Sequence, residues 1–212
     1  FAGVFGALVE VYGDPNDTQW WRIGEDVTRT TAFPSGTLRN LQNPNQGGTK
    51  DPGYQPKTMS QYAYLRDTED EDNGGVHVNS GIPNYAFYLF ASNTNVGLAR
   101  AEQVYYRALT KYLTRTSKFV DARLAVVRSA SELYGGDASA VTQAAKAAFD
   151  AVGILDPNAA TGGTSTSTTP NTTPKTIPTN PGADYILVFD PTDNKLYNGK
   201  ITEQLKPITS RG

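Results

Sequence analysis

The sequence predicts a mainly α-helical domain with long irregular loops, followed by a linker and a short β tail. Apolar residues recur at helical spacing near both ends of residues 1–155. Between these segments, residues 28–66 are polar, rich in Pro and Gly, and without a sustained period. At residue 156 the composition shifts to Thr, Pro, Ser and Gly, and a strand pattern follows. We therefore expect a helical domain at 1–155, a linker at 156–182 and a β-hairpin or truncated β module at 183–212.

Composition and charge narrow the classes of function. The chain has 212 residues, and 38% of them are hydrophobic, which suffices for a core. A net charge of −2 gives no electrostatic case for binding nucleic acid or an anionic membrane surface. No run approaches the roughly 18 consecutive apolar residues that span a bilayer. The absence of cysteine excludes disulfides and thiolate catalysis, and the Asn-, Thr-, Tyr- and Gly-rich composition fits a secreted bacterial protein.

The first predicted helix spans residues 1–12 and is apolar on nearly every side. Val4, Leu8 and Val9 follow the helical period, so we expect this helix to be buried. Glu10 lies within it. A carboxylate on a buried helix needs a cation or a base beside it, unless it faces water.

The loop that follows, at 13–27, is acidic. Its carboxylates are Asp14, Asp17, Glu25 and Asp26. Together with Glu10 they are offset within this stretch by one basic residue, Arg22. Oxygen-rich loops of this kind suit Ca²⁺, a hard cation that takes 6–8 oxygen ligands. A solvated acidic loop without a metal is the alternative.

The irregular stretch at 28–66 is long for a compact domain. Such loops are usually functional or held against a partner surface. Within it, Arg39 lies between Leu38 and Leu41. An arginine flanked by apolar residues is either a member of a core ion pair or a group that recognises carbonyl or carboxylate oxygens.

The second half of the domain reads as helices that pack on one another. Helical stripes occupy 82–91, 98–113 and 118–134, with a last helix carrying Val141, Ala145, Ala148 and Val152 on one face. The expected N-caps are Ser80, Ser117 and Asp137, and the expected stop is at Gly135. Each stripe is most simply helix–helix core, so none is given a cofactor role.

His77 is the single histidine of the chain. It lies five positions after Asp72, on a Gly-Gly turn that leads into the helix at 82–91. An imidazole beside a carboxylate is a candidate proton-transfer site, although a structural histidine is the alternative. With one histidine and no cysteine, the chain cannot supply a zinc site of the usual three-ligand kind.

Several motifs together resemble one family. The stretch DNGGVHVNSG at 72–81 is similar to the signature of the thermolysin-like neutral zinc metalloproteases. Further matches occur in that family's order: GALVEVY, WRIGEDV, GTLRNL, VYYRALTKYLT, ARLAVVRSASELYG and AAFDAVGI. The resemblance covers roughly residues 1–154 and implies the C-terminal helical lobe of a secreted, two-lobed zinc endopeptidase.

The resemblance implies half of a catalytic site. In the family, an HExxH helix and a later glutamate bind the zinc upstream of the segment present here, so we expect a fragment that is inactive alone and needs the missing N-terminal lobe. His77 matches the imidazole that stabilises the oxyanion, and Asp72 the carboxylate that holds its ring. The other matched positions are Arg39, which grips a substrate carbonyl, and Leu38, Ile23 and Val27, which line the S1′ pocket. A preference for cleaving peptides before bulky apolar residues follows.

The resemblance also implies calcium, with departures. Glu10, Glu25 and Asp26 match acidic positions of the family, and Asp17 or Asp14 is a substitute ligand in a loop about two residues longer. Trp20 and Arg22 stand where the family has acidic residues, so one calcium ion or none is expected rather than two. Gly3 replaces an aspartate that orients a zinc-binding histidine. These departures motivate the alternative of a non-catalytic helical binding or structural module.

Overall fold

The computed structural model describes residues 1–157, and beyond them the backbone of the strands at 186–190, 195–199 and 206–207. Most of the predicted linker at 156–182 therefore lies outside the described residues. The chain divides into two compact units, Phe1–Gly162 and Gly163–Gly212. No helix in the described part of the chain is long and apolar enough to cross a membrane.

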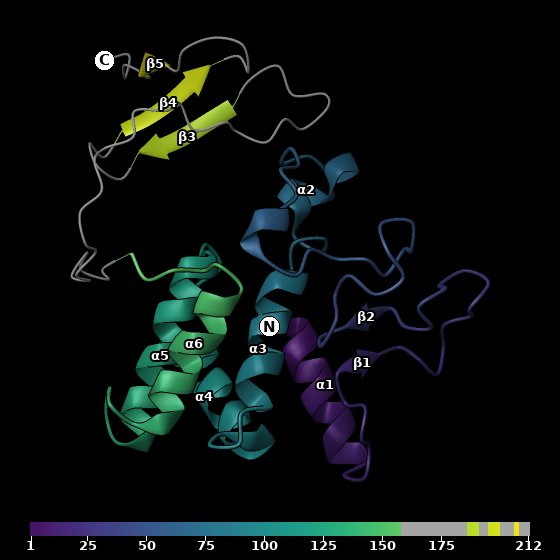
Figure 1. Ribbon diagram of the computed structural model, residues 1–212, viewed down its shortest axis with the longest axis vertical. Helices are drawn as coiled ribbons and strands as arrows, with labels where there is room; N and C mark the ends of the chain where they lie inside the picture. Colours follow the sequence, from purple (N-terminus) through teal and green to yellow (C-terminus); the bar gives the residue numbers. More distant parts are fainter. Residues whose placement is uncertain (158–185, 191–194, 200–205, 208–212) are drawn as a thin grey trace, which may run out of the picture. The chain divides into compact units, whose positions relative to one another are not determined.

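The first unit is helical, as predicted (Figure 1). Its main helices are α1 (Ala2–Gly13), α3 (Gly81–Ala91), α4 (Gly97–Lys111), α5 (Phe119–Tyr134) and α6 (Ala140–Ala151). Helix α3 runs through the middle, in contact with α1, α4 and α6. Of the residues predicted to form the stripe on α3, Ile82, Ala86 and Phe90 are each 0% exposed, whereas Leu89 is half-buried. The helical periods of the sequence therefore mark the core correctly.

Irregular chain connects α1 to α3. It contains a two-stranded antiparallel pair, β1 (Arg22–Ile23) with β2 (Arg39–Asn40), and the short turns η1 (Met59–Gln61), η2 (Glu69–Glu71) and α2 (Asp72–Gly75). Helix α2 lies just beyond the first turn of α3 (Figure 1). The long irregular segment predicted at 28–66 is thus present, interrupted by β2 and η1.

The prediction that the first helix is buried on nearly every side is wrong. In α1, Val4 and Ala7 are buried, whereas Val9 is 70% and Tyr12 89% exposed. The helix contacts α3, α4 and β1 along one side, and its apolar periodicity does not reveal how much of its surface these neighbours cover.

Two predicted caps are also wrong. Lys118, not Ser117, is the N-cap of α5, and its backbone N–H donates to the Asp121 carboxylate at 2.7 Å. Ser139, not Asp137, caps α6 by accepting from the Thr142 N–H at 3.2 Å. The stop of α5 is as predicted.

Ser80 does occupy the residue before α3, but its hydroxyl makes no cap and donates to the His77 carbonyl oxygen at 2.6 Å instead. Gly135 ends α5 in the left-handed region at φ 92°. The Ser80 hydroxyl, which could have capped α3, instead holds the turn that carries His77.

The second unit contains the strands expected in the tail. β3 (Ile186–Asp190), β4 (Lys195–Gly199) and β5 (Lys206–Pro207) form an antiparallel sheet in the order β3-β4-β5. Ile186 pairs with Gly199 and Asp190 with Lys195. The domain boundaries proposed at 155 and 182 stay predictions.

Candidate active site

The turn that carries His77 begins with four residues in the left-handed region. Asp72, Asn73, Gly74 and Gly75 have φ of 59°, 46°, 78° and 78°. Asp and Asn tolerate this conformation better than other residues with side chains, and Gly adopts it without strain. Gly75 is also sterically required, because a Cβ there would lie 2.6 Å from Nδ2 of Asn79. The DNGG sequence is therefore what allows the chain to reverse at this point.

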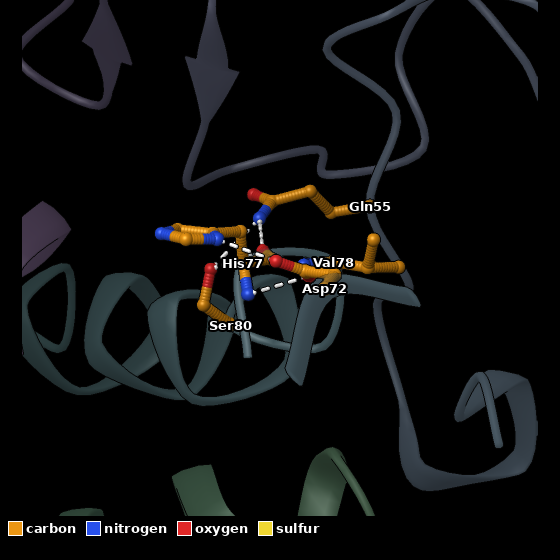
Figure 2. A network of polar contacts seen from close by, with 5 residues as sticks. All are labelled: Gln55, Asp72, His77, Val78 and Ser80. Carbon is orange, nitrogen blue, oxygen red and sulfur yellow. Dashed lines mark hydrogen bonds and ion pairs between the residues drawn. The ribbon is translucent and has the colours of Figure 1, made fainter. Parts of the chain in front are cut away.

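The reversal brings the Asp72 carboxylate under the next turn (Figure 2). Oδ2 accepts from the backbone N–H groups of His77, at 2.8 Å, and Val78, at 2.9 Å. Oδ1 lies 2.5 Å from Nδ1 of the His77 ring. The Val78 amide and the His77 groups hold the pKa of Asp72 below its usual value, against the opposing effect of desolvation. Asp72 is therefore an ionised acceptor with three donors.

The His77 ring projects from this turn into the open. Its side chain is 76% exposed, and Figure 2 shows the far ring nitrogen directed away from the other residues drawn. Because ionised Asp72 only accepts hydrogen bonds, Nδ1 carries a proton, and Nε2 carries one in the imidazolium form. The charged ring can thus donate from Nε2 to a negatively charged oxygen.

The predicted wall residues come together on the β1–β2 pair. Ile23 faces Arg39 in register, and the Leu38 N–H donates to the Ile23 carbonyl at 2.9 Å. Gly24 lies between two of the apolar side chains, since a Cβ on it would be 3.0 Å from Leu38 Cβ and 3.8 Å from Val27 Cγ2. Leu38 is 40% and Val27 82% exposed, so apolar surface is presented outward.

Arg39 lies beside this wall and is half-buried. Burial lowers its pKa, while the charge of Asp72 raises it, so the guanidinium lies within electrostatic range of the His77 turn. It donates from Nη1 to the Leu38 carbonyl at 2.8 Å. Arg39 is therefore held by a backbone oxygen rather than built into a core ion pair.

Three of the four predicted calcium ligands lie within electrostatic range of the fourth, Glu10. Burial, and then the charges of Glu25, Asp17 and Asp26, raise the pKa of Glu10. Oδ2 of Asp17 and Oε2 of Glu25 are buried without a hydrogen-bond partner in the described structure. Within residues 1–157, no three Asp, Glu or His side chains lie close enough as they stand to enclose a metal ion. Buried unpaired oxygens are what a cation would satisfy.

The departures from the family pattern have structural reasons. Trp20 is 9% exposed and packs edge-on against Phe87 at 5.9 Å, so it serves as core. Arg22 donates to Oε1 of Gln19 at 2.9 Å and to the Gly36 carbonyl at 3.4 Å. At Gly3, a Cβ would lie 3.0 Å from Nδ2 of buried Asn84, so an aspartate there would require Asn84 to move.

Sequence reasoning missed one residue of the site. Gln55 is buried, and its amide nitrogen donates to the His77 carbonyl at 2.5 Å and to Ser80 Oγ at 2.8 Å (Figure 2). The sequence offers no periodic signal for it, because it lies in irregular chain 22 positions before its acceptor. Pro56, which follows it, favours an extended backbone at Gln55 and is the one local cue.

A helical domain that holds an exposed histidine with a carboxylate, beside apolar side chains, defines the class of protein: an α-helical domain with a candidate hydrogen-bond donor site. The comparisons make it specific. The chain belongs to the family described as thermolysin metallopeptidase, alpha-helical domain, which matches residues 1–154.

Curated relatives agree with this family. The chain is 46% identical over 154 residues to a bacillolysin of Bacillus amyloliquefaciens, covering 70% of the chain and 26% of the relative. It is 44% identical over 155 residues to the neutral protease NprE of Bacillus pumilus, covering 70% and 46%. It is 40% identical over 159 residues to a thermolysin of Alicyclobacillus acidocaldarius, covering 71% and 27%. The chain thus spans less than half the length of each of these relatives.

Proposed function

We propose that the chain is the C-terminal lobe of a secreted zinc metalloendopeptidase, in which His77 stabilises the negative charge that develops on the carbonyl oxygen of the scissile peptide. The observation that carries this proposal is the 2.5 Å contact between Asp72 Oδ1 and Nδ1 of an imidazole whose far side is exposed. Asp72 fixes the orientation of the ring through Nδ1, so that Nε2–H of the imidazolium form is aimed at an incoming anion before the reaction begins. Donors arranged in advance in this way typically contribute on the order of 10²–10³ in rate.

The wall beside the histidine supports a peptide or protein substrate. Ile23, Val27 and Leu38 offer an apolar surface for the side chain that follows the scissile bond, which favours cleavage before bulky apolar residues. The Arg39 guanidinium, within electrostatic range of Asp72, supplies a charged donor for a substrate carbonyl. The apolar surface and the Arg39 guanidinium together would align the peptide across the His77 ring.

The zinc of such an enzyme does not fit the residues of this chain. The sequence holds one histidine and no cysteine, so no HExxH pair can be formed from it. We assign the metal and the base to an N-terminal lobe, which is the partner that this proposal requires. The 212-residue chain alone is expected to hydrolyse no peptide and to bind no zinc tightly.

Calcium does fit. Glu10, Asp17, Glu25 and Asp26 gather four carboxylates at the end of α1 and the following loop, and two of their oxygens are buried without partners. A bound Ca²⁺ would neutralise their repulsion and fix the loop that leads into β1. Its role is structural, since it would fasten the segment on which Ile23 stands.

The test is to supply the N-terminal lobe that the proposal requires. The chain is fused behind the N-terminal lobe of the Bacillus amyloliquefaciens bacillolysin, and hydrolysis of peptides with a bulky apolar or a small residue after the scissile bond is measured. The proposal predicts activity that prefers the apolar peptide and falls roughly 10²–10³-fold in His77→Ala. Activity unaffected by His77→Ala would refute the catalytic assignment.

A second candidate is a helical binding or structural module derived from this lobe. The packing of Gly3 against Asn84 favours it, because the aspartate expected at that position is missing close to the chemistry. A folded fusion protein that binds zinc but hydrolyses no peptide would support this module over the enzyme.

A further inference from the structure

Gln55 contacts the backbone of the catalytic histidine from the opposite side to Asp72. Its side-chain nitrogen donates to the His77 carbonyl at 2.5 Å and to Ser80 Oγ at 2.8 Å. Ser80 Oγ in turn donates to the same carbonyl at 2.6 Å. Figure 2 shows the three groups closing a ring of hydrogen bonds around the His77 carbonyl oxygen. Nε2 of Gln55 thus contacts both the His77 carbonyl oxygen and Ser80 Oγ.

Gln55 is itself buried and hydrogen-bonded through its backbone, so it can act as an anchor. It is 2% exposed, and its backbone N–H donates to the Pro44 carbonyl at 2.9 Å. Its own carbonyl accepts from Nδ2 of Asn45 at 2.9 Å. Its Cβ lies against Gly81, where a Cβ would be only 2.5 Å away. The donors that reach His77 therefore come from a fixed support.

The His77 ring depends on such support more than a buried side chain would. With 76% of the side chain exposed, packing does not fix it. Asp72 fixes the ring nitrogen and the backbone N–H of His77, but this carboxylate stands on a left-handed turn with φ of 59°. Gln55 fixes the carbonyl side, so the two residues together hold the peptide units on both sides of the ring.

The segment that carries Gln55 also supports the apolar wall. Asp51 accepts from the Ser35 N–H and the Gly53 N–H, each at 2.7 Å. Gly53 packs so closely that a Cβ on it would lie 2.7 Å from the Thr37 carbonyl and 3.0 Å from that of Leu38. Residues 51–55 therefore touch the wall at one end and the His77 turn at the other.

We propose that Gln55 is a positioning residue for the reaction, which sets the His77 ring relative to the substrate wall through the His77 carbonyl. This inference rests on the proposed function for its catalytic consequence, but its structural consequence can be measured on its own. Loss of the two donors frees the carbonyl to move and leaves Asp72 as the ring's main restraint. The loss of one net hydrogen bond then corresponds to roughly three- to tenfold more frequent displacement of the ring.

The single histidine makes the test direct. The 212-residue chain is labelled with ¹⁵N-histidine, so that its ring nitrogens give one pair of signals, and exchange of the Nδ1 proton with water is measured. Gln55→Met removes the donors at similar volume. Gln42→Met is the matched control, because Gln42 lies in the same loop and donates to Tyr88 on α3 at 2.7 Å without touching the His77 turn.

The expected result is a roughly three- to tenfold faster exchange in Gln55→Met and no change in Gln42→Met. In the fusion protein, Gln55→Met should lower kcat by a similar factor and leave KM unchanged. Unchanged ring exchange in a folded Gln55→Met chain would overturn the inference.

The remaining outcomes are also decisive. If ring exchange responds but His77→Ala leaves hydrolysis unaffected, the positioning stands and the proposed function fails. Gln55→Glu, equal in shape, is the second variant where Gln55→Met does not fold. If neither folds while Gln42→Met does, Gln55 is a structural residue of the loop and the inference is wrong.

Discussion

Gly81, the first residue of α3, offers a sharp test of how the loop and the helix fit together. A Cβ at this position would lie 2.5 Å from Gln55 Cβ and 2.6 Å from the Pro56 carbonyl oxygen. Real Cβ atoms do not approach other heavy atoms so closely. One of these contacts is to backbone that is itself held in place, because the Gln55 N–H donates to the Pro44 carbonyl at 2.9 Å. Gly81→Ala must therefore displace the loop from the helix.

Two opposing effects decide whether Gly81→Ala raises or lowers the stability of the fold. Alanine gains at most about 1 kcal/mol over glycine in a helix, and less in its first turn. Overpacking a dense core costs typically about 1–3 kcal/mol. Because the clash involves backbone rather than the end of a flexible side chain, we expect overpacking to win by about 1–2 kcal/mol. For a domain of this size the melting temperature should fall by about 2–8 °C.

Gly6 is the matched control. It lies inside α1, and a Cβ on it would meet nothing within 4 Å. Gly6→Ala should therefore stabilise the chain by about 0.5–1 kcal/mol, the helix propensity difference alone. Thermal unfolding followed by circular dichroism gives both values, and the two identical substitutions should shift the melting temperature in opposite directions. A melting temperature raised by Gly81→Ala as much as by Gly6→Ala would refute the packing described for the Gln55 loop.

Two further predictions concern charge. Ca²⁺ at about 100 times its Kd should stabilise the chain by about 2.7 kcal/mol, which corresponds to a melting temperature about 5–10 °C higher. Glu10→Gln should remove most of that gain. An unchanged melting temperature on adding Ca²⁺ would contradict the site. In calcium-free buffer the variant should be the more stable chain above pH 4.5, the ordinary pKa of Glu10, because the folded state raises this pKa and disfavours ionisation. The difference in stability between Glu10→Gln and the wild type should disappear as the pH falls through 4.5. Separately, hydrogen bonds from three side chains hold the pKa of Glu132 at about 2, below its usual 4.5: Tyr112, Arg107 and Arg128. Its contribution to stability is complete above pH 4.5 and lost as the pH falls towards 2, so wild type and Glu132→Gln should differ in melting temperature near neutral pH and converge in acid.

The helices could be predicted from the sequence because burial follows a period. Ile82 and Phe90 recur at the helical interval, and both are fully buried on α3. The extent of burial could not be predicted in the same way. Tyr12 continues the apolar run of α1 yet is 89% exposed, because the neighbouring elements cover one side of that helix. Periodicity gives the face of a helix but not the size of what packs on it.

The residues of the candidate site also differ in whether the local sequence reveals them. Asp72 and His77 are close in sequence, and the glycines between them predict the turn that joins them. Gln55 contacts the same turn from 22 positions away, and apart from the proline that follows it nothing local distinguishes it from the other glutamines of the loop. Ser80 misled for a related reason: a serine before a helix is normally a cap, but here a carbonyl oxygen within reach captures its hydroxyl. Long-range hydrogen bonds of irregular chain leave no pattern in the sequence.

The central claim is that Asp72 and His77 act as one unit that donates to the developing oxyanion. The most direct measurement is a double-mutant cycle on kcat in the fusion protein, with His77→Ala, Asp72→Asn and both together. Residues that act as a unit are strongly non-additive. The account predicts that the double variant is no slower than His77→Ala alone, because without the ring Asp72 has nothing catalytic to hold. Losses that multiply in the double variant would contradict it.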